Sequence, residues 1–125
     1  TFVAQSFSSD LKDLTALIEA GIRHKGFSLI NVFSPCVTYN KVNTYDWFKE
    51  NLTKLSTIEG YDPANKEVAM QTLMQHQGLV TGLIYQNTAQ PSYQELIQGY
   101  AENPLSSADL KLTQEHFDKL TAEFM

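Results

Sequence analysis

The stretch of sequence that decides the fold is FVAQSFSSDLKDLTALIEAGIRHKGFSLINVF, residues 2–33. Residues 2–7 are typical of a strand, and residues 11–22 place leucine and isoleucine along one face of a helix. Residues 27–33 are almost continuously apolar, which suits a strand covered on both faces. A strand, a helix and a second strand within about 30 residues form a βαβ unit with a right-handed crossover. The stretch therefore predicts an α/β fold built on parallel strands.

Helix-capping signals extend this prediction along the chain. Ser8 or Ser9 is expected to cap the first helix, with Asp10 stabilising its positively charged end. Asn43 or Thr44 is expected to cap the next helix, and Asp62 the one after it, with proline at its first position. The predicted downstream elements are helices over 44–55 and 63–77, a strand over 79–86, a short helix from residue 92 and a helix over 113–125.

Length and composition restrict the class of protein. The chain has 125 residues, of which 42% are hydrophobic and 18% charged, as in an ordinary globular domain or part of a larger one. Its nine lysines and arginines are scattered and the net charge is -5, which argues against nucleic acid as a partner. No apolar run reaches the roughly 18 residues of a membrane span. A single cysteine cannot form an internal disulfide, so we expect a cytoplasmic protein.

The first residues also carry information. TFVAQSF reads as a strand from its first residue, whereas domain termini usually fray at the surface. We therefore expect residue 1 to be a cut point, with the natural chain extending upstream. The alternative is an edge strand at a true terminus.

Cys36 lies in VFSPCVTYN, residues 32–40, just past the second predicted strand. In open parallel sheets, ligands bind beyond the carboxyl ends of the strands. The residues alone favour a small, partly buried packing thiol at this position. A nucleophile and a metal ligand are the alternatives. A nucleophile needs a nearby base or helix N-terminus to lower its pKa, and a metal ligand needs thiolates that this chain lacks.

Other candidate residues favour structural roles. Sequence motifs for phosphate loops, CxxC, HExxH and GxSxG are absent, and the acidic residues form no recognisable catalytic pair. The histidines share no metal-ligand spacing, so we expect surface or capping roles for His24, His76 and His116. An aromatic cluster is expected to pack in the core, with a stacking surface as the alternative: Tyr39, Tyr45, Trp47 and Phe48.

GFSLINVFSPCVTYN (26–40), followed by TYDWFKENL (44–52), resembles the β subunit of the 2-oxoacid:ferredoxin oxidoreductases, most closely the 2-oxoglutarate type. GLIYQNTAQPSYQEL (82–96) is similar to a segment in the C-terminal part of that family. TFVAQSFSSD (1–10) is similar to the strand and turn before its long crossover helix. The resemblance thus covers roughly residues 1–100.

The resemblance implies an oxidoreductase that decarboxylates a 2-oxoacid, such as 2-oxoglutarate or pyruvate, with coenzyme A and passes two electrons to ferredoxin. In this family the β subunit binds thiamine diphosphate and Mg²⁺ through a GDG-type motif, and four cysteines hold a [4Fe–4S] cluster. By position, Cys36 matches the fourth of these cluster ligands. The chain has no GDG motif and no further cysteine, so no residue here is assigned to thiamine diphosphate or Mg²⁺, and no cofactor site is complete.

We therefore interpret the chain as the C-terminal portion of such a β subunit, inactive by itself. Residues 1–60 would form the parallel βαβ core that completes a thiamine-diphosphate-binding domain, and residues 61–125 a mostly helical C-terminal extension. The expected partners are the α subunit, ferredoxin, the 2-oxoacid and coenzyme A, with no nucleic acid and no membrane. The isolated portion is also expected to self-associate through surfaces that are buried in the full-length protein.

Two further hypotheses stay open. The first is a non-catalytic α/β interaction module in which Cys36 is a packing cysteine or a surface thiol. The second is a small thiol-dependent enzyme, which requires a histidine within about 4 Å of Cys36.

Overall fold

The computed structural model describes residues 1–97, 106, 109 and 111–122. It divides into two compact units, Thr1–Ser92 and Tyr93–Met125. The first unit contains the whole sheet and the helices that pack on it, and it also contains Cys36.

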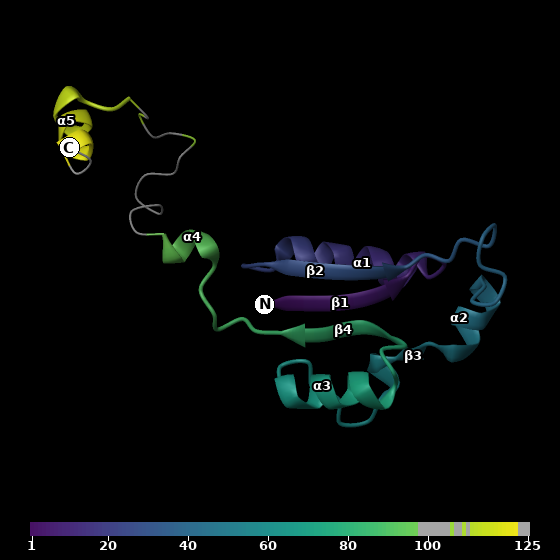
Figure 1. Ribbon diagram of the computed structural model, residues 1–125. Coiled ribbons are helices and arrows are strands. Elements are labelled where there is room, and N and C mark those ends of the chain that lie inside the picture. The colour runs from purple at the N-terminus through teal and green to yellow at the C-terminus, as the bar shows by residue number, and fades with distance from the viewer. Residues whose placement is uncertain (98–105, 107–108, 110, 123–125) are drawn as a thin grey trace. The chain divides into compact units, whose positions relative to one another are not determined.

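A four-stranded sheet in the order β2-β1-β4-β3 organises the first unit (Figure 1). β1 (Phe2–Phe7) pairs in parallel with β2 (Ser28–Phe33), which confirms the predicted βαβ unit. β4 (Val80–Gln86) pairs antiparallel with β1 and parallel with β3 (Thr53–Lys54). The fold is therefore mixed α/β, and the strand predicted over 79–86 lies inside the sheet.

The crossover helix α1 (Leu11–Arg23) joins β1 to β2. Its N-cap is Asp10, whose side chain accepts a hydrogen bond from the Asp13 N–H, so the prediction of a serine cap is wrong. The reason is a turn before the helix, in which the Asp10 N–H donates to the Phe7 carbonyl. Gly21 lets α1 approach the sheet closely, since a Cβ there would lie 3.1 Å from Ile30 Cδ1.

β2 forms one edge of the sheet, and its side chains alternate between partly buried and exposed. The prediction of a strand covered on both faces is therefore wrong in this unit. Alternate side chains of a strand point to opposite faces. Ser28 and Ile30 lie close to α1, whereas Leu29, on the opposite face, is 50% exposed.

The second helix, α2 (Tyr45–Asn51), begins at the predicted cap Thr44, whose hydroxyl accepts from the Trp47 N–H. It ends four residues before the predicted end. The helix ends there because the Thr53 N–H donates to the Leu79 carbonyl instead of to a helical carbonyl. The chain then enters the sheet as β3. A short 3₁₀ turn, η1 (Leu55–Thr57), then buries Leu55 in the core.

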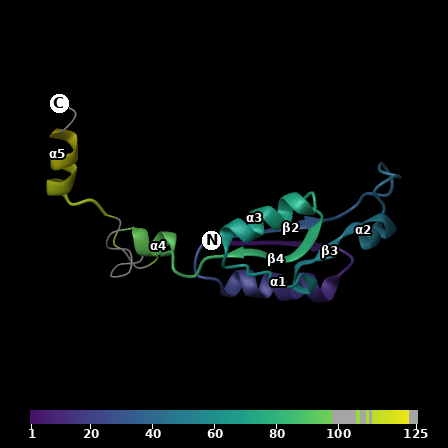
Figure 2. The same ribbon diagram turned by 90° about the horizontal axis from the view of Figure 1, so that it is seen from below.

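The third helix, α3 (Lys66–Gln75), covers the face of the sheet opposite α1 (Figure 2). The prediction of Asp62 as its cap is wrong, because the Asp62 carboxylate accepts from the Ala64 N–H and forms a turn ahead of the helix. Asn65 is the N-cap instead. Two apolar clusters form the core, one between each helix and the sheet. The cluster at α1 contains Phe2, Ala4 and Leu17, and the cluster at α3 contains Leu55, Ala69, Val80 and Ile84.

The Gln5 side chain ties three parts of the sheet together. Its amide nitrogen donates to the carbonyls of Gly78 and Val80, at 2.7 and 2.8 Å. Its oxygen accepts from the Asn31 side chain of β2, at 2.8 Å. This buried amide therefore uses its hydrogen-bonding groups to hold β2, β1 and the start of β4 in register.

We expect Gly82→Ala to lower the free energy of unfolding by about 2 kcal/mol, measured by chemical denaturation. Gly82 has a φ of +121°, and a Cβ added there would lie 3.3 Å from Leu55 Cβ. Backbone strain and crowding therefore both destabilise the folded variant. Gly60→Ala is the matched control, because Gly60 has a φ of +74° but no atom within 4 Å of the added Cβ. If the two variants lose the same free energy of unfolding, the contact with Leu55 contributes nothing to the destabilisation.

The second unit contains α4 (Tyr93–Leu96) and α5 (Gln114–Ala122), which confirm the two helices predicted at these positions. Phe117 and Leu120 of α5 are each 51% exposed. Most of residues 101–112 lie outside the described residues, as do residues 123–125 at the end of the helix predicted over 113–125. The division into units falls after Ser92, because β4 pairs with β1. The boundary at residue 60 of a thiamine-diphosphate-binding domain stays a prediction.

Candidate functional site

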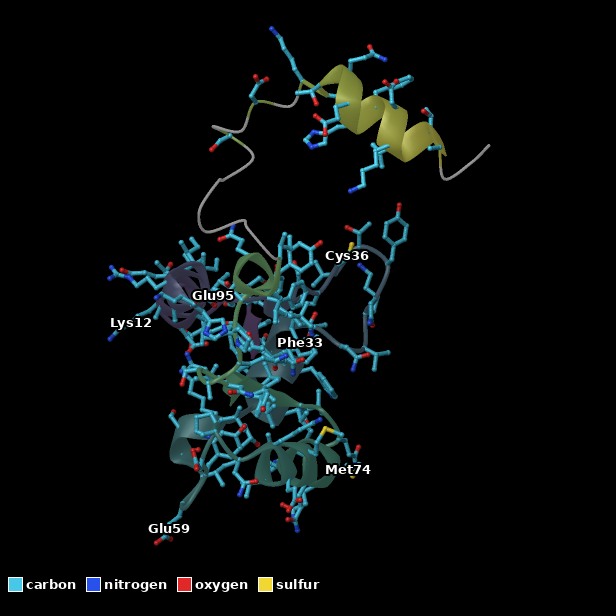
Figure 3. The ribbon with its side chains drawn as sticks, turned by 90° about the vertical axis from the view of Figure 1, so that its left-hand side faces the viewer. Lys12, Phe33, Cys36, Glu59, Met74 and Glu95 are labelled. Atoms are coloured by element: carbon cyan, nitrogen blue, oxygen red, sulfur yellow. The ribbon has the colours of Figure 1, made fainter. Side chains whose placement is uncertain are left out.

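The loop that leaves the carboxyl end of β2 and leads to α2 (Figure 1) contains Cys36, whose side chain is exposed. This loop, residues 34–44, is called the cysteine loop below. Figure 3 shows Cys36 on one side of the sheet and Lys12 of α1 on the other. The exposure contradicts the interpretation of Cys36 as a partly buried packing thiol within this unit.

Polar groups within the cysteine loop hold its shape. The Asn40 N–H donates to the Cys36 carbonyl at 2.9 Å, which closes a tight turn around the thiol. The Asn40 side-chain oxygen in turn accepts from the N–H groups of Val42 and Asn43, both at 2.9 Å. The loop is therefore braced by an asparagine that uses both its backbone and its side chain.

Three donors in this turn stabilise the thiolate form of Cys36. The backbone N–H of Tyr39, then that of Thr38, and finally the Thr38 hydroxyl lower the pKa of the Cys36 thiol below its ordinary value. Hydrogen bonds to the charged form favour that form. Since the thiolate is the form that binds metals and attacks electrophiles, these donors favour the reactive form of the exposed sulfur.

Aromatic rings fasten the two ends of the cysteine loop. Phe33 precedes the loop and Phe48 follows it, and their ring centroids lie 5.1 Å apart. Phe48 also lies 5.7 Å from Phe7 of β1. We call Phe7, Phe33 and Phe48 the aromatic anchor. Because the anchor joins both flanks of the loop to the sheet, it positions Cys36.

The predicted aromatic cluster is confirmed in part. Phe48 packs in the aromatic anchor, and Trp47 meets it edge-on at 5.0 Å. Tyr45 lies 5.8 Å from Phe7 but is 37% exposed. The prediction is wrong for Tyr39, which lies in the turn closed by Asn40 and is 91% exposed.

The histidines of the first unit have the predicted capping roles. His24 is the C-cap of α1, and its ring hydrogen-bonds with the side chains of Thr1 and Gln86. Thr1 precedes β1, so His24 lies at the end of the parallel strands opposite Cys36. His76 is the C-cap of α3, and His116 is exposed on α5. No histidine is among the described groups that shift the Cys36 pKa, so the thiol-enzyme hypothesis finds no support here.

A cleft of about 270 Å³ opens near the N-terminus of α1. Across it, Lys54 Nζ of β3 lies 2.7 Å from Asp10 Oδ2 at the helix cap, which joins two elements 44 residues apart. This pair could not be predicted from the sequence, because only the position of β3 in the sheet brings the two residues together. The lining residues are Phe7, Ser9, Asp10, Lys49, Leu52, Lys54 and Thr81.

We expect Asp10→Asn to lower the free energy of unfolding at pH 7 by up to about 1 kcal/mol, because the ion pair is partly exposed and screened. Asparagine keeps the helix cap, so the substitution isolates the ion pair. The hydrogen bond from Lys54, then that from the Asp13 N–H, lowers the pKa of Asp10 below its ordinary 3.8. Its contribution is therefore complete above about pH 3.8 and is lost as the pH falls through the lowered value.

Denaturation curves recorded between pH 2 and pH 7 check this prediction. The difference between wild type and Asp10→Asn should shrink as the pH falls through this acid range. A difference that stays constant across it would exclude the ion pair as the cause.

Within the described residues, no three or more histidine, cysteine, aspartate or glutamate side chains are grouped to hold a metal ion. The described helices also include none that is both long and apolar enough to cross a membrane. Cys36 therefore offers one thiolate ligand and no complete site.

The fold and the site define a mixed α/β protein whose exposed thiol follows a parallel strand. Residues 36–102, over half of the chain, match the family model for the C-terminal part of the pyruvate ferredoxin oxidoreductase beta subunit. The chain therefore belongs to the β-subunit family of the 2-oxoacid:ferredoxin oxidoreductases, as the resemblance predicted.

Relatives and a solved structure agree with this family. The chain is 35% identical over 131 residues to a 2-oxoacid:ferredoxin oxidoreductase subunit beta of Sulfolobus sp, covering 97% of this chain and 43% of that protein. It is 28% identical over 131 residues to the subunit beta of 2-oxoacid:ferredoxin oxidoreductase 2 of Aeropyrum pernix, covering 94% of this chain and 42% of that protein. The chain thus spans about two fifths of the length of these relatives.

The fold is similar to that of a 2-oxoglutarate:ferredoxin oxidoreductase from Magnetococcus marinus, with a TM-score of 0.74 and 28% identity. The match covers 96% of this chain and 40% of that chain, and that structure holds 2-oxoglutarate, coenzyme A and succinyl-CoA.

Proposed function

We propose that the chain is the C-terminal part of a β subunit that works in the oxidative decarboxylation of a 2-oxoacid with coenzyme A and the reduction of ferredoxin. The observation that carries the proposal is the exposed Cys36 thiol beyond a parallel strand, at the first residue of the family match. The 2-oxoacid we propose is 2-oxoglutarate. Its support is the similarity to a solved enzyme that holds 2-oxoglutarate and succinyl-CoA.

The role we assign to Cys36 is that of the fourth ligand of a [4Fe–4S] cluster. The residues of the cysteine loop fit one ligand of such a cluster: the sulfur is exposed, and nearby N–H groups favour its thiolate form. Hydrogen bonds to the sulfurs also tune the potential of a cluster. The remaining three ligands would come from polypeptide outside these 125 residues.

A bound cluster would supply one-electron transfer towards ferredoxin. The contribution of this chain is to hold the thiolate in place. Asn40 closes the turn around Cys36, and the aromatic anchor fastens the loop to the sheet. Thiamine diphosphate and Mg²⁺ belong to the proposed enzyme as well, but no residue described here is assigned to them.

The partners in this proposal are the α subunit of the same enzyme and ferredoxin, in the cytoplasm. The 125-residue chain by itself is expected to be inactive and to self-associate, because surfaces that are buried in the full-length protein are open. Neither nucleic acid nor a membrane has a place in the proposed reaction.

The proposal is tested with the full-length gene product purified together with its α subunit. Ferredoxin reduction is followed under anaerobic conditions with coenzyme A and one of three acids: 2-oxoglutarate, pyruvate or a branched 2-oxoacid. We expect reduction to need both the acid and coenzyme A and to be fastest with 2-oxoglutarate. An intact, iron-loaded complex that reduces ferredoxin with none of the acids would refute the function. Faster reduction with pyruvate would refute only the assigned substrate.

A further inference from the structure

The cleft near the N-terminus of α1 is lined by a buried hydroxyl that has no hydrogen-bonding partner in the described part of the chain. This hydroxyl belongs to Thr81 of β4, which is only 6% exposed. Its side chain forms no hydrogen bond with any described residue. Buried hydroxyls are normally hydrogen-bonded to protein or to ordered water. The Thr81 hydroxyl is therefore free to bind a molecule that enters the cleft.

A second donor lies directly beside this hydroxyl. Lys54 of β3 is the partner of Thr81 in the parallel register, so the two side chains point to the same face of the sheet, about 5 Å apart. Lys54 Nζ lies 2.7 Å from Asp10 Oδ2 across the cleft. An ammonium group has three N–H donors, and Asp10 is the one partner of Lys54 among the described side chains. Lys54 and Thr81 thus present two neighbouring donors to the cleft.

This pair of donors fits a carboxylate. A carboxylate has two oxygens, of which one accepts from the ammonium group and the other from the hydroxyl. The charges around the cleft are nearly balanced, because Asp10 pairs with Lys54 and Asp46 pairs with Lys49, a further lining residue. The partial positive charge at the N-terminus of α1 adds to this balance. A group with a single negative charge is therefore favoured over a doubly charged phosphate.

The rest of the lining restricts the size and polarity of the ligand. Phe7 and Leu52 provide an apolar wall beside the two donors. The volume of about 270 Å³ is below the range of roughly 300 to 1,000 Å³ that holds drug-sized ligands. The cleft therefore suits a short aliphatic chain that ends in one carboxylate.

We propose that this cleft binds a short-chain aliphatic carboxylate. Its oxygens accept hydrogen bonds from Lys54 Nζ and the Thr81 hydroxyl, and its chain packs against Phe7 and Leu52. The lining comes from the end of β1, the start of α1, α2, β3 and β4, so the site exists only in the folded unit. It involves neither Cys36 nor any step of the proposed reaction.

Titration of the full-length gene product with butyrate tests the site. We expect the backbone amide NMR signals of Lys54 and Thr81 to shift saturably, with a dissociation constant in the millimolar range because the ligand is so small. Butanol has the same chain without the carboxylate and should bind at least about tenfold more weakly, since it lacks the charged acceptor. The absence of a saturable shift at these two residues, or equal affinity for butanol, would overturn the proposal.

Substitutions at Thr81 test the hydroxyl. Thr81→Val removes only the hydroxyl and should raise the dissociation constant of butyrate about tenfold, whereas Thr81→Ser should keep it within about twofold. Thr72→Val is the matched control, because Thr72 is also 6% exposed but lies on α3 and does not line the cleft. Equal affinities of Thr81→Val and Thr72→Val for butyrate would overturn the assignment of the hydroxyl.

A substitution at Lys54 tests the ammonium group. We expect Lys54→Met to abolish saturable binding of butyrate and Lys66→Met to leave it unchanged. Lys66 is an exposed lysine at the start of α3 and does not line the cleft, so its variant controls for the loss of one positive charge. Wild-type affinity in Lys54→Met would overturn the proposal, even if Thr81→Val does not fold. These titrations involve no iron and no activity, so failure here is distinct from failure of the proposed function.

Discussion

Replacing Cys36 with serine in the full-length protein is expected to abolish the proposed [4Fe–4S] cluster. Iron should fall from about four atoms per subunit to less than about one, and ferredoxin reduction should fall to background. The physical reason is the ligand. Thiolates hold such clusters, whereas a serine hydroxyl stays protonated and is a poor ligand for them. Iron and acid-labile sulfide contents, together with the EPR spectrum of the reduced protein, measure the outcome.

Thr38→Val is the matched control for this experiment. It keeps the Cys36 sulfur and both backbone donors and removes only the hydroxyl that helps to lower the Cys36 pKa. We expect Thr38→Val to retain its iron and to shift the reduction potential of the cluster downwards, since one hydrogen bond to the sulfur is lost. A Cys36→Ser protein with unchanged iron and an unchanged spectrum would reject the ligand assignment.

The second large effect is expected for Phe48→Ala in the full-length protein. The free energy of unfolding should fall by about 3 kcal/mol, because the substitution removes a large ring and leaves a cavity in the aromatic anchor. The rings of Phe7 and Phe33 both lose a partner, at 5.7 and 5.1 Å. Since the anchor holds both ends of the cysteine loop, the variant should also lose iron more readily than wild type. Chemical denaturation and the rate of iron loss to a chelator measure the two effects.

Tyr39→Ala provides the matched control for Phe48→Ala. Tyr39 lies three residues after Cys36 but is 91% exposed. Its backbone N–H, the larger influence on the Cys36 pKa, is kept by alanine. We expect its stability to stay within about 0.5 kcal/mol of wild type, with iron loss unchanged. Equal effects in the two variants would contradict the role of the aromatic anchor.

Local sequence signals predicted the positions of the main elements but not all their ends. The strands at residues 2–7 and 79–86 and the helix between β1 and β2 were identified from apolar periodicity. The caps at Asp10 and Asn65 were missed because several neighbouring residues are good caps and turn geometry selects among them. The early end of α2 was missed because the Thr53 N–H hydrogen-bonds with the Leu79 carbonyl instead of continuing the helix. Local sequence signals do not report this contact, since Leu79 is distant along the chain.

The candidate site was predicted in position but not in its chemistry. The place of Cys36 beyond a parallel strand follows from the order of the elements, and its proposed role came from the resemblance to a family. Its exposure and the donors of Thr38 and Tyr39 depend on the turn that Asn40 closes. The Lys54–Asp10 pair depends on strand pairing and carried no local signal.

The sequence by itself determined the β1–α1–β2 unit and the cysteine that follows it, because hydrophobic periodicity acts between residues close along the chain. Only the tertiary structure decided that β4 lies antiparallel beside β1, and that β2 is left at the edge with apolar residues around it. The neighbours of a strand depend on which distant segments lower the free energy by pairing. A periodic pattern records that a strand has apolar faces, but it does not record what covers them.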